Sequence, residues 1–568
     1  MSRIAIAAVL MALCLGGKAA AQDQPLPLGQ PRPDAATIQA WKDRKFGLFI
    51  HFGLYSVAAG MWKGKRIDNG YSEQILANGH LPPKQYAALA KRFDPQKFDA
   101  DAIAALAQAA GMKFIVLTAK HHDGFNLFHT AKTAYNVVDG TPYGRDIVAE
   151  MAQACARHGL AFGVYYSTID WHHPGGNRYL PGNSNPITAA QADFNVGQVK
   201  ELLGHYGPIS EIWFDMGKPT PAQSARFAQT VHDLQPQTLV SGRVWNHQGD
   251  FTVMGDNQDP GVAVEEPWQS PASMFPETWG YRSWQVRGEV RPKVEEHITR
   301  LVRVVSHGGN YILNVGPEGD GSVVPFEADV LKVIGDWMKV NGEAIYGMAP
   351  SPFDTLDFGY ATLGAHRLYL FIEKPPADGV LHLPGLVDTR LTAAHMLGGD
   401  GTALPVSTDA DGGKVDVHGL AGRFMPVVAV DFDGDFHVRP NALRPSPDGR
   451  VILTEATAAH FLNYNGYGYA APDTLYKLRW HAAAGPGRYR AELRYRAVPA
   501  PHRLDLVVDG HVTHLTLPAG GRATVLVARD PAAEPYAMRV ELTPVEPFHK
   551  GDALPVKVTR LDLIPVKP

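Results

Sequence analysis

Residues 114–123 read FIVLTAKHHD, an apolar run that ends in a cluster of polar side chains. Three further segments repeat this pattern: FGLFIH at 46–51, FGVYYS at 162–167 and EIWFD at 211–215. Apolar runs of this length, bounded by turn signals, indicate strands that are buried on both faces. Because the polar residues fall at the C-terminal end of each strand, we predict a (β/α) barrel whose site lies at that rim. The pattern therefore predicts an enzyme, with its chemistry around Asp215.

The segments that follow these strands extend the prediction along the chain. Helical periodicity occurs near residues 99–110, 144–158, 188–205, 221–234, 292–306 and 324–341. We therefore expect the catalytic barrel at residues 22–349. After Pro350 the helical pattern gives way to short alternating runs between Gly, Pro and Asp clusters, which predicts antiparallel β-structure. We expect a β-sandwich at 350–438 and a second β-rich module at 439–568, so the fold class is α/β, a TIM-like barrel followed by C-terminal β-sandwich modules.

The first residues have the pattern of a secretory signal peptide at 1–21. Arg3 precedes the apolar stretch 4–15, and small residues at 19–21 favour a cut after Ala21. The apolar stretch is too short to span a membrane. Cleavage removes Cys14 and leaves Cys155 alone, so no intramolecular disulfide is expected. Export without disulfides points to a bacterial periplasm.

The composition and the motifs argue against several other classes of function. The formal net charge is −4 and no run of Lys and Arg occurs, so we expect no nucleic-acid partner. The sequence contains no Gly-x-Ser-x-Gly elbow, no phosphate-binding loop and no His-Glu-x-x-His zinc helix. The pairs His121-His122 and His172-His173 lack the further ligands that a metal site needs, so we expect no metal and no cofactor.

The polar residues at the predicted strand ends suit a sugar. A monosaccharide presents several hydroxyls and an apolar ring face, so its site needs neutral hydrogen-bonding groups, aromatic rings and two carboxyl groups. Asp215 supplies one carboxyl group, next to the apolar wall of Trp213 and Phe214. The candidate sugar-binding residues are His51, Trp62, His121, His122, Tyr165, Tyr166, Arg243 and Trp284.

Five motifs occur in order along the predicted barrel: KFGLFIHFG at 45–53, TAKHHDGF at 118–125, IWFD at 212–215, ETWGY at 277–281 and GNYILNVGP at 309–317. Together they closely resemble glycoside hydrolase family 29, the retaining alpha-L-fucosidases, over about residues 36–350. The resemblance implies a barrel, a following β-sandwich and no metal. It also implies that Asp215 is the nucleophile. The implied sugar pocket contains His51, His121, His122, Arg243, and either Tyr165 or Tyr166.

Two motifs differ from the pattern of that family. Gly60-Met61-Trp62 stands where the family often has Gly-Glu-Trp, and Tyr71-Ser72-Glu73-Gln74 stands where it often has Tyr-x-Glu-Trp. The first difference replaces a sugar-binding carboxylate with a thioether, and the second removes an aromatic wall. Both leave the substrate preference open.

We predict a retaining exo-alpha-L-fucosidase that removes terminal fucose from glycans. In this mechanism Asp215 attacks the anomeric carbon, and a protonated glutamic acid donates its proton to the leaving oxygen. We expect Glu277 to be this acid/base, because the aromatic residues at 279, 281 and 284 can desolvate it and raise its pKa. Glu266, which is followed by Pro267 and Trp268, is the alternative.

Two other functions remain open at this point. One is a related glycosidase for a galactose-like sugar, because fucose and galactose of the appropriate enantiomers share hydroxyl stereochemistry around the ring. The other is a carbohydrate-binding protein built on a catalytically dead barrel. The presence of Asp215 and of acidic residues near 266 and 277 argues against the second.

Overall fold

The computed structural model describes residues 32–174, 185–419, 423–461, 477–498, 501–532, 535–545 and 556–566. The predicted signal peptide at 1–21 lies outside the described residues. Within the described ranges, no helix is long and apolar enough to cross a membrane.

Eight parallel strands form the central sheet, in the order β7-β6-β5-β4-β1-β10-β9-β8. A parallel bridge between Ser241, directly after β7, and Phe251, directly before β8, links the two ends of this order. The sheet is thus a TIM-like barrel, as the sequence predicted. Its strands are β1 (Phe46–Ile50), β4 (Phe114–Lys120), β5 (Ala161–Ser167), β6 (Glu211–Asp215), β7 (Leu239–Val240), β8 (Thr252–Val253), β9 (Trp268–Ser273) and β10 (Asn310–Val315).

The six predicted helices are confirmed as α5 (Ala100–Ala109), α7 (Ile147–Arg157), α8 (Ala189–His205), α9 (Pro221–Leu234), α10 (Val290–Ser306) and α11 (Pro325–Asn341). Local sequence explains where several of them begin. The Asp99 and Asp146 side chains accept hydrogen bonds from the first turns of α5 and α7, and Thr220 forms a capping box with Gln223 at the start of α9.

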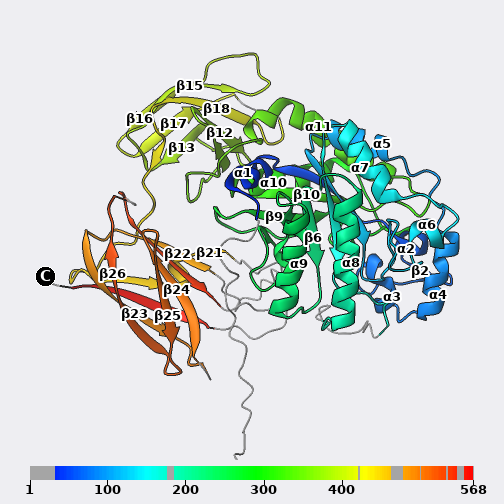
Figure 1. Cartoon of the computed structure of the whole chain (residues 1–568). Helices are drawn as coiled ribbons and strands as arrows, with labels where there is room; N and C mark the ends of the chain where they lie inside the picture. Colours follow the sequence, from blue (N-terminus) through cyan, green and yellow to red (C-terminus); the bar gives the residue numbers. More distant parts are fainter. Residues whose placement is uncertain are drawn as a thin grey trace, which may run out of the picture. The chain divides into compact units, whose positions relative to one another are not determined.

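Shorter elements complete the barrel region. They are α1 (Ala35–Asp43), α2 (Leu54–Ala58), α3 (Ile75–Asn78), α4 (Pro83–Ala87), α6 (Val137–Gly140) and the hairpin β2 (Met61–Trp62) with β3 (Lys65–Arg66). Figure 1 shows the long helices outside the barrel strands. Cys155 is buried in α7, as predicted, and its burial raises the pKa of the thiol to about 12.

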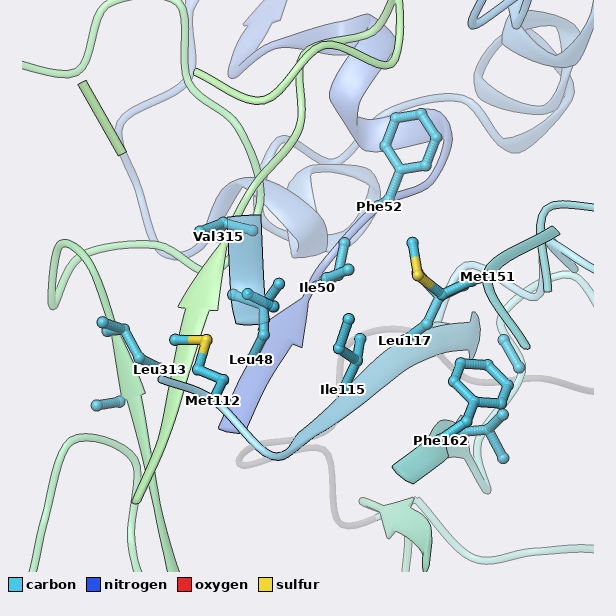
Figure 2. Close-up of a cluster of buried hydrophobic side chains, with 14 of the residues drawn as sticks. Leu48, Ile50, Phe52, Met112, Ile115, Leu117, Met151, Phe162, Leu313 and Val315 are labelled. Carbon is cyan, nitrogen blue, oxygen red and sulfur yellow. The ribbon is translucent and has the colours of Figure 1, made fainter. Parts of the chain in front are cut away.

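Successive residues of a barrel strand face opposite sides, and the two sides belong to different cores. Leu48 and Ile50 of β1 pack into a large outer cluster with residues of the helices, whereas Phe49 belongs to a small aromatic cluster inside the barrel. Figure 2 draws part of the outer cluster, with Leu48 and Ile50 on β1 and Met151 on α7. Because both faces are apolar, the strands show no polar alternation in sequence.

The described residues beyond 350 form mainly antiparallel β-structure, as predicted. Two sheets share one apolar core, in the orders β11-β12-β18-β15 and β13-β17-β16. Two more share another core, in the orders β20-β28-β23-β26 and β21-β22-β27-β24-β25. The domain boundaries at 349 and 438 stay predictions.

The strands of these sheets are β11 (Gly359–Leu363), β12 (Arg367–Ile372), β13 (Val380–Pro384), β15 (Arg390–Met396), β16 (Val406–Asp409), β17 (Gly412–Asp416), β18 (Val427–Asp433), β20 (Val451–Thr454), β21 (Ala459–Phe461), β22 (Lys477–Ala482), β23 (Gly487–Tyr495), β24 (His502–Val508), β25 (His511–Leu517), β26 (Arg522–Arg529), β27 (Met538–Pro544) and β28 (Val558–Pro565). A separate short pair joins β14 (Leu386–Val387) to β19 (His437–Val438).

Candidate active site

A pocket opens at the C-terminal ends of the barrel strands, where the sequence predicted the site. Strand ends supply part of its lining, and loops supply the rest. The lining residues are Phe49, His51, Tyr71, Glu73, Gln74, His121, His122, Tyr165, Trp213, Asp215, Met216, Arg243, Asp256 and Trp279. No cluster of His, Cys, Asp and Glu that could hold a metal ion occurs in the described part of the chain.

Asp215 is the last residue of β6 and is 5% exposed. Its Oδ2 accepts a hydrogen bond from the Tyr165 hydroxyl at 2.7 Å, and its Oδ1 accepts one from Arg243 Nη1 at 3.0 Å. Burial raises the pKa of Asp215, while the Arg243 guanidinium opposes that rise. The carboxylate is therefore oriented by two donors and held close to a positive charge.

Arg243 holds a second carboxyl group next to Asp215. Its Nη2 donates to Asp256 Oδ1 at 2.8 Å and to the Met254 carbonyl at 3.2 Å. The Asp256 side chain is 20% exposed, against 7% for that of Asp215. One guanidinium thus joins a buried carboxylate to a carboxyl group that water can reach.

The pocket histidines are buried, and burial lowers the pKa of His51 to about 4 and that of His122 to about 3. Both rings are therefore neutral near pH 7. Asn314 donates its Nδ2 to the Trp279 carbonyl, so its Oδ1 must accept from His51 Nδ1 at 2.7 Å. Ser167 donates to the Ile169 carbonyl and in turn accepts from His122 Nδ1. Each ring consequently presents an Nε2 lone pair as an acceptor.

Glu73 brings a third carboxyl group to the pocket. It is 1% exposed, and its Oε2 accepts hydrogen bonds from the backbone N–H groups of Trp279 and Gly280 at 3.1 and 2.9 Å. Burial raises the pKa of Glu73 to about 7, and these hydrogen bonds oppose the rise. The carboxyl group can therefore be neutral at mildly acidic pH and donate a hydrogen bond.

A family model described as alpha-L-fucosidase matches residues 19–343. The chain belongs to the alpha-L-fucosidase family. The tissue alpha-L-fucosidase of Homo sapiens is 31% identical over 407 residues, which cover 67% of this chain and 85% of that protein. The sequence-based assignment to this family is thus confirmed.

Two solved alpha-L-fucosidase structures extend the similarity. One from a Vibrio species, strain EJY3, has a TM-score of 0.67 at 25% identity and covers 94% of this chain and 99% of that chain. A second, from Bacteroides thetaiotaomicron, has a TM-score of 0.64 at 25% identity and covers 71% of this chain and 98% of that one. It was solved as a trapped covalent intermediate, which is the hallmark of a retaining mechanism. The chain is a glycoside hydrolase, a retaining alpha-L-fucosidase, and the two alternatives are not favoured.

Among the predicted pocket residues of this fucosidase, the structure distinguishes Tyr165 from Tyr166. Tyr165 lines the pocket and contacts Asp215, whereas the Tyr166 hydroxyl donates to Gln198 Oε1 of α8 at 2.7 Å and lies 3.0 Å from Asn195 Oδ1, outside the barrel. The assignment of Tyr166 to the sugar pocket was wrong, because neighbouring residues of a strand face opposite sides.

Tyr165→Phe is expected to lower the kcat/KM for a fucoside roughly ten- to hundredfold, because it removes a hydrogen bond to a charged carboxylate. Tyr166→Phe is the matched control: it loses a hydroxyl at the neighbouring position and should keep the wild-type kcat/KM. Steady-state kinetics of both purified variants checks this pair. Equal losses in the two variants would contradict the assignment.

The carboxyl groups chosen from sequence as the acid/base lie elsewhere. The Glu277 side chain is exposed and does not line the pocket, so the expectation that aromatic residues bury it was wrong. Glu266 precedes β9, at the opposite end of the barrel from Asp215, and pairs with Lys477 at 2.7 Å. The loop residues Asp256 and Glu73 occupy the pocket instead. No sequence pattern pointed to Asp256. Glu73 lies in the Tyr71–Gln74 motif, in which only the difference at Gln74 was interpreted.

The two predicted tryptophans also lie outside the pocket lining. Trp62 is half-buried in β2, and Trp284 donates its Nε1 to the Gly60 carbonyl while the Arg66 guanidinium stacks 3.6 Å from its ring centre. Of the two positions that differ from the family motifs, Met61 does not line the pocket and Gln74 does. Only the second difference therefore acts directly on the site.

Glu73 should make the stability of the enzyme depend on pH. Below its ordinary pKa of 4.5 the carboxyl is protonated whether the chain is folded or not. Between pH 4.5 and about 7 folding has to take up a proton, so the cost grows with pH and is complete once the folded carboxyl ionises above about 7. The full cost is about 3 kcal/mol, at 1.36 kcal/mol per pKa unit. Glu73→Gln removes this pH-dependent cost, so the Tm of the variant minus the Tm of the wild type should increase from about pH 5 to about pH 8. A Tm difference that stays constant over this range, measured by thermal unfolding, would contradict the role of this group.

Proposed function

We propose that Asp215 is the nucleophile and Asp256 the acid/base of this fucosidase. In the first step a carboxylate oxygen of Asp215 bonds to the anomeric carbon, the glycosidic C–O bond breaks, and the leaving oxygen takes the Asp256 proton. In the second step Asp256 removes a proton from water. The resulting hydroxide attacks the anomeric carbon, the ester bond to Asp215 breaks, and fucose leaves with its configuration retained.

The observation that carries this proposal is the shared guanidinium of Arg243. Asp215 and Asp256 each lie one hydrogen bond from it, at 3.0 and 2.8 Å. This arrangement is compatible with the separation of ~5–5.5 Å between the two carboxyl groups of a retaining glycosidase. It also suits the charge balance of the reaction, because the arginine can stabilise whichever carboxyl group is ionised.

Asp256 fits the acid/base role better than the other two candidates. The acid/base must reach both the leaving group and the incoming water, and Asp256 is part-exposed while lining the pocket. Glu73 is 1% exposed and is held by two backbone N–H groups. Glu277 does not line the pocket. We assign Glu73 instead to a sugar hydroxyl, together with the Nε2 acceptors of His51 and His122.

We further propose that the substrate is a glycan with terminal alpha-linked L-fucose and that residues 1–21 direct export, to the periplasm of a bacterium. The substrate follows from the family, and export from the charged, apolar and small-residue pattern of the first 21 residues. N-terminal sequencing of the protein from a periplasmic extract should begin at Gln22. Recovery of the full chain from the cytoplasm would contradict export.

Turnover of a nitrophenyl alpha-L-fucoside tests the proposed function, with the matching alpha-galactoside as the comparison. We expect hydrolysis of the fucoside with the alpha anomer of fucose as the first product, seen by proton NMR. A first product of inverted configuration would contradict the roles of both carboxyl groups. Faster turnover of the galactoside would contradict the proposed substrate.

A further inference from the structure

A chain of buried polar side chains runs through the barrel from the end opposite the pocket. It starts at Glu211, the first residue of β6, which is fully buried. The carboxylate accepts hydrogen bonds from Trp41 Nε1 of α1 and from Gln269 Nε2 of β9, the latter at 3.2 Å. Residues around it inside the barrel, such as Phe114 and Val116, are apolar. An ionisable group is costly to bury in such surroundings, and its burial raises the pKa of Glu211.

Gln269 connects this carboxylate to the pocket. Its Oε1 accepts a hydrogen bond from Trp213 Nε1 at 2.7 Å, while its Nε2 faces Glu211. The direction of the amide is fixed at both ends, because an indole N–H can only donate and the carboxylate offers acceptors. Gln269 is fully buried, so a reversed amide would leave donors facing one another without water to separate them.

The indole of Trp213 then forms part of the pocket wall. The Arg243 guanidinium lies 4.8 Å from the centre of its ring, and the Tyr165 ring stacks on it at 5.9 Å. These two residues are the ones that donate hydrogen bonds to Asp215. A shift of the indole would therefore displace both donors of the proposed nucleophile.

We propose that Gln269, anchored by Glu211, is a positioning residue of this active site: it fixes the Trp213 indole and, through it, the Arg243 that holds Asp215 and Asp256. This role rests on the proposed function of those two carboxyl groups. The positioning role explains why the barrel keeps Glu211 and Gln269 at this place, where two apolar side chains of similar volume would avoid the cost of burying a charge.

The main test is Gln269→Met, which keeps the volume of the side chain and removes both hydrogen bonds. We expect kcat for a nitrophenyl fucoside to fall about tenfold with little change in KM, because the displaced groups act on the reaction rather than on sugar hydroxyls. The acidic limb of the kcat/KM profile should also move to higher pH, because Arg243 would lower the pKa of Asp215 less. Trp213→Phe removes the other partner of the bond, so the double variant should lose much less than the product of the two single losses.

Thr238→Val is the matched control at the same end of the barrel. Thr238 is 1% exposed, donates its hydroxyl to the Ile209 carbonyl at 2.6 Å and does not line the pocket. This variant should lose thermal stability and keep the wild-type kcat and pH profile. If Gln269→Met behaves in the same way as Thr238→Val, Gln269 is only structural and the proposal is wrong.

Two further measurements cover the cases in which activity or folding fails. In protein labelled with 5-fluorotryptophan, the fluorine resonance of Trp213, assigned by its loss in Trp213→Phe, should shift or broaden in Gln269→Met. An unchanged resonance overturns the positioning role without any substrate, whereas an inactive wild type contradicts the proposed function alone.

If Gln269→Met does not fold, Gln269→Glu is the second variant. It keeps an acceptor for the Trp213 indole but places its carboxyl group against that of Glu211, so the two carboxyl groups share one proton. Its kcat should fall as pH rises and that proton is lost; a wild-type profile would contradict the proposal.

Discussion

Asp215→Ala is expected to lower the turnover of a nitrophenyl fucoside by roughly three decades or more, because it removes the group that forms the covalent intermediate. The fold should survive, since the change removes a buried carboxylate from a pocket and leaves Arg243 paired with Asp256. Steady-state kinetics, with circular dichroism as the check on folding, measures both effects. Retention of a tenth of the wild-type rate would place the nucleophile elsewhere.

Added azide, an external nucleophile, gives a second measurement on the Asp215→Ala variant. The alanine variant leaves space beside the anomeric carbon, so added azide should restore turnover and give a fucosyl azide of inverted configuration. A variant of the same pocket that keeps Asp215, such as Tyr165→Phe, should show no such product. Azide product from both variants would mean that the rescue does not report on Asp215.

Asp256→Ala is expected to have the second-largest effect, and its size should depend on the leaving group. Loss of a general acid/base costs on the order of 10²–10⁴ in rate when the leaving group needs a proton. A glycan with a sugar leaving group should suffer this loss in full, whereas the first step of an activated nitrophenyl fucoside needs little protonation. Azide should rescue the second step of the nitrophenyl reaction with retained configuration, because it needs no base.

Two parallel variants identify the acid/base among the remaining carboxyl groups. Glu277→Ala, at the exposed position favoured by sequence, should keep the wild-type rates on both substrates. Glu73→Gln should raise KM for both substrates without any preference for the leaving group, as expected for a group that binds a sugar hydroxyl. If the leaving-group dependence and the azide rescue appear in Glu73→Gln rather than in Asp256→Ala, the acid/base is Glu73.

Residues that mark the end of a strand could be placed at the site from the sequence. His51 and Asp215 each terminate an apolar run, and both line the pocket. After β4, where His121 and His122 were the predicted pocket residues, the register against β5 shifts between Thr118 and Lys120. Lys120 consequently faces α8, bonding to Asn195 at 3.2 Å, while the next residue, His121, lines the pocket. An irregularity of one residue has no signature in an apolar run, although it decides which side chain reaches the site.

The sequence by itself determined the barrel and the β-rich modules, because these depend on local periodicity and on the common direction of parallel strands. The family, and the expectation that Asp215 is its nucleophile, came from the resemblance of five ordered motifs. The tertiary structure alone decided which of Tyr165 and Tyr166 faces inward, since strands buried on both faces carry no alternation to read. It alone brought Glu73 and Asp256 to Asp215, because barrel closure, and not sequence spacing, sets which loops meet above the strands. It also excluded Glu266, which precedes its strand and so lies at the other end of the barrel.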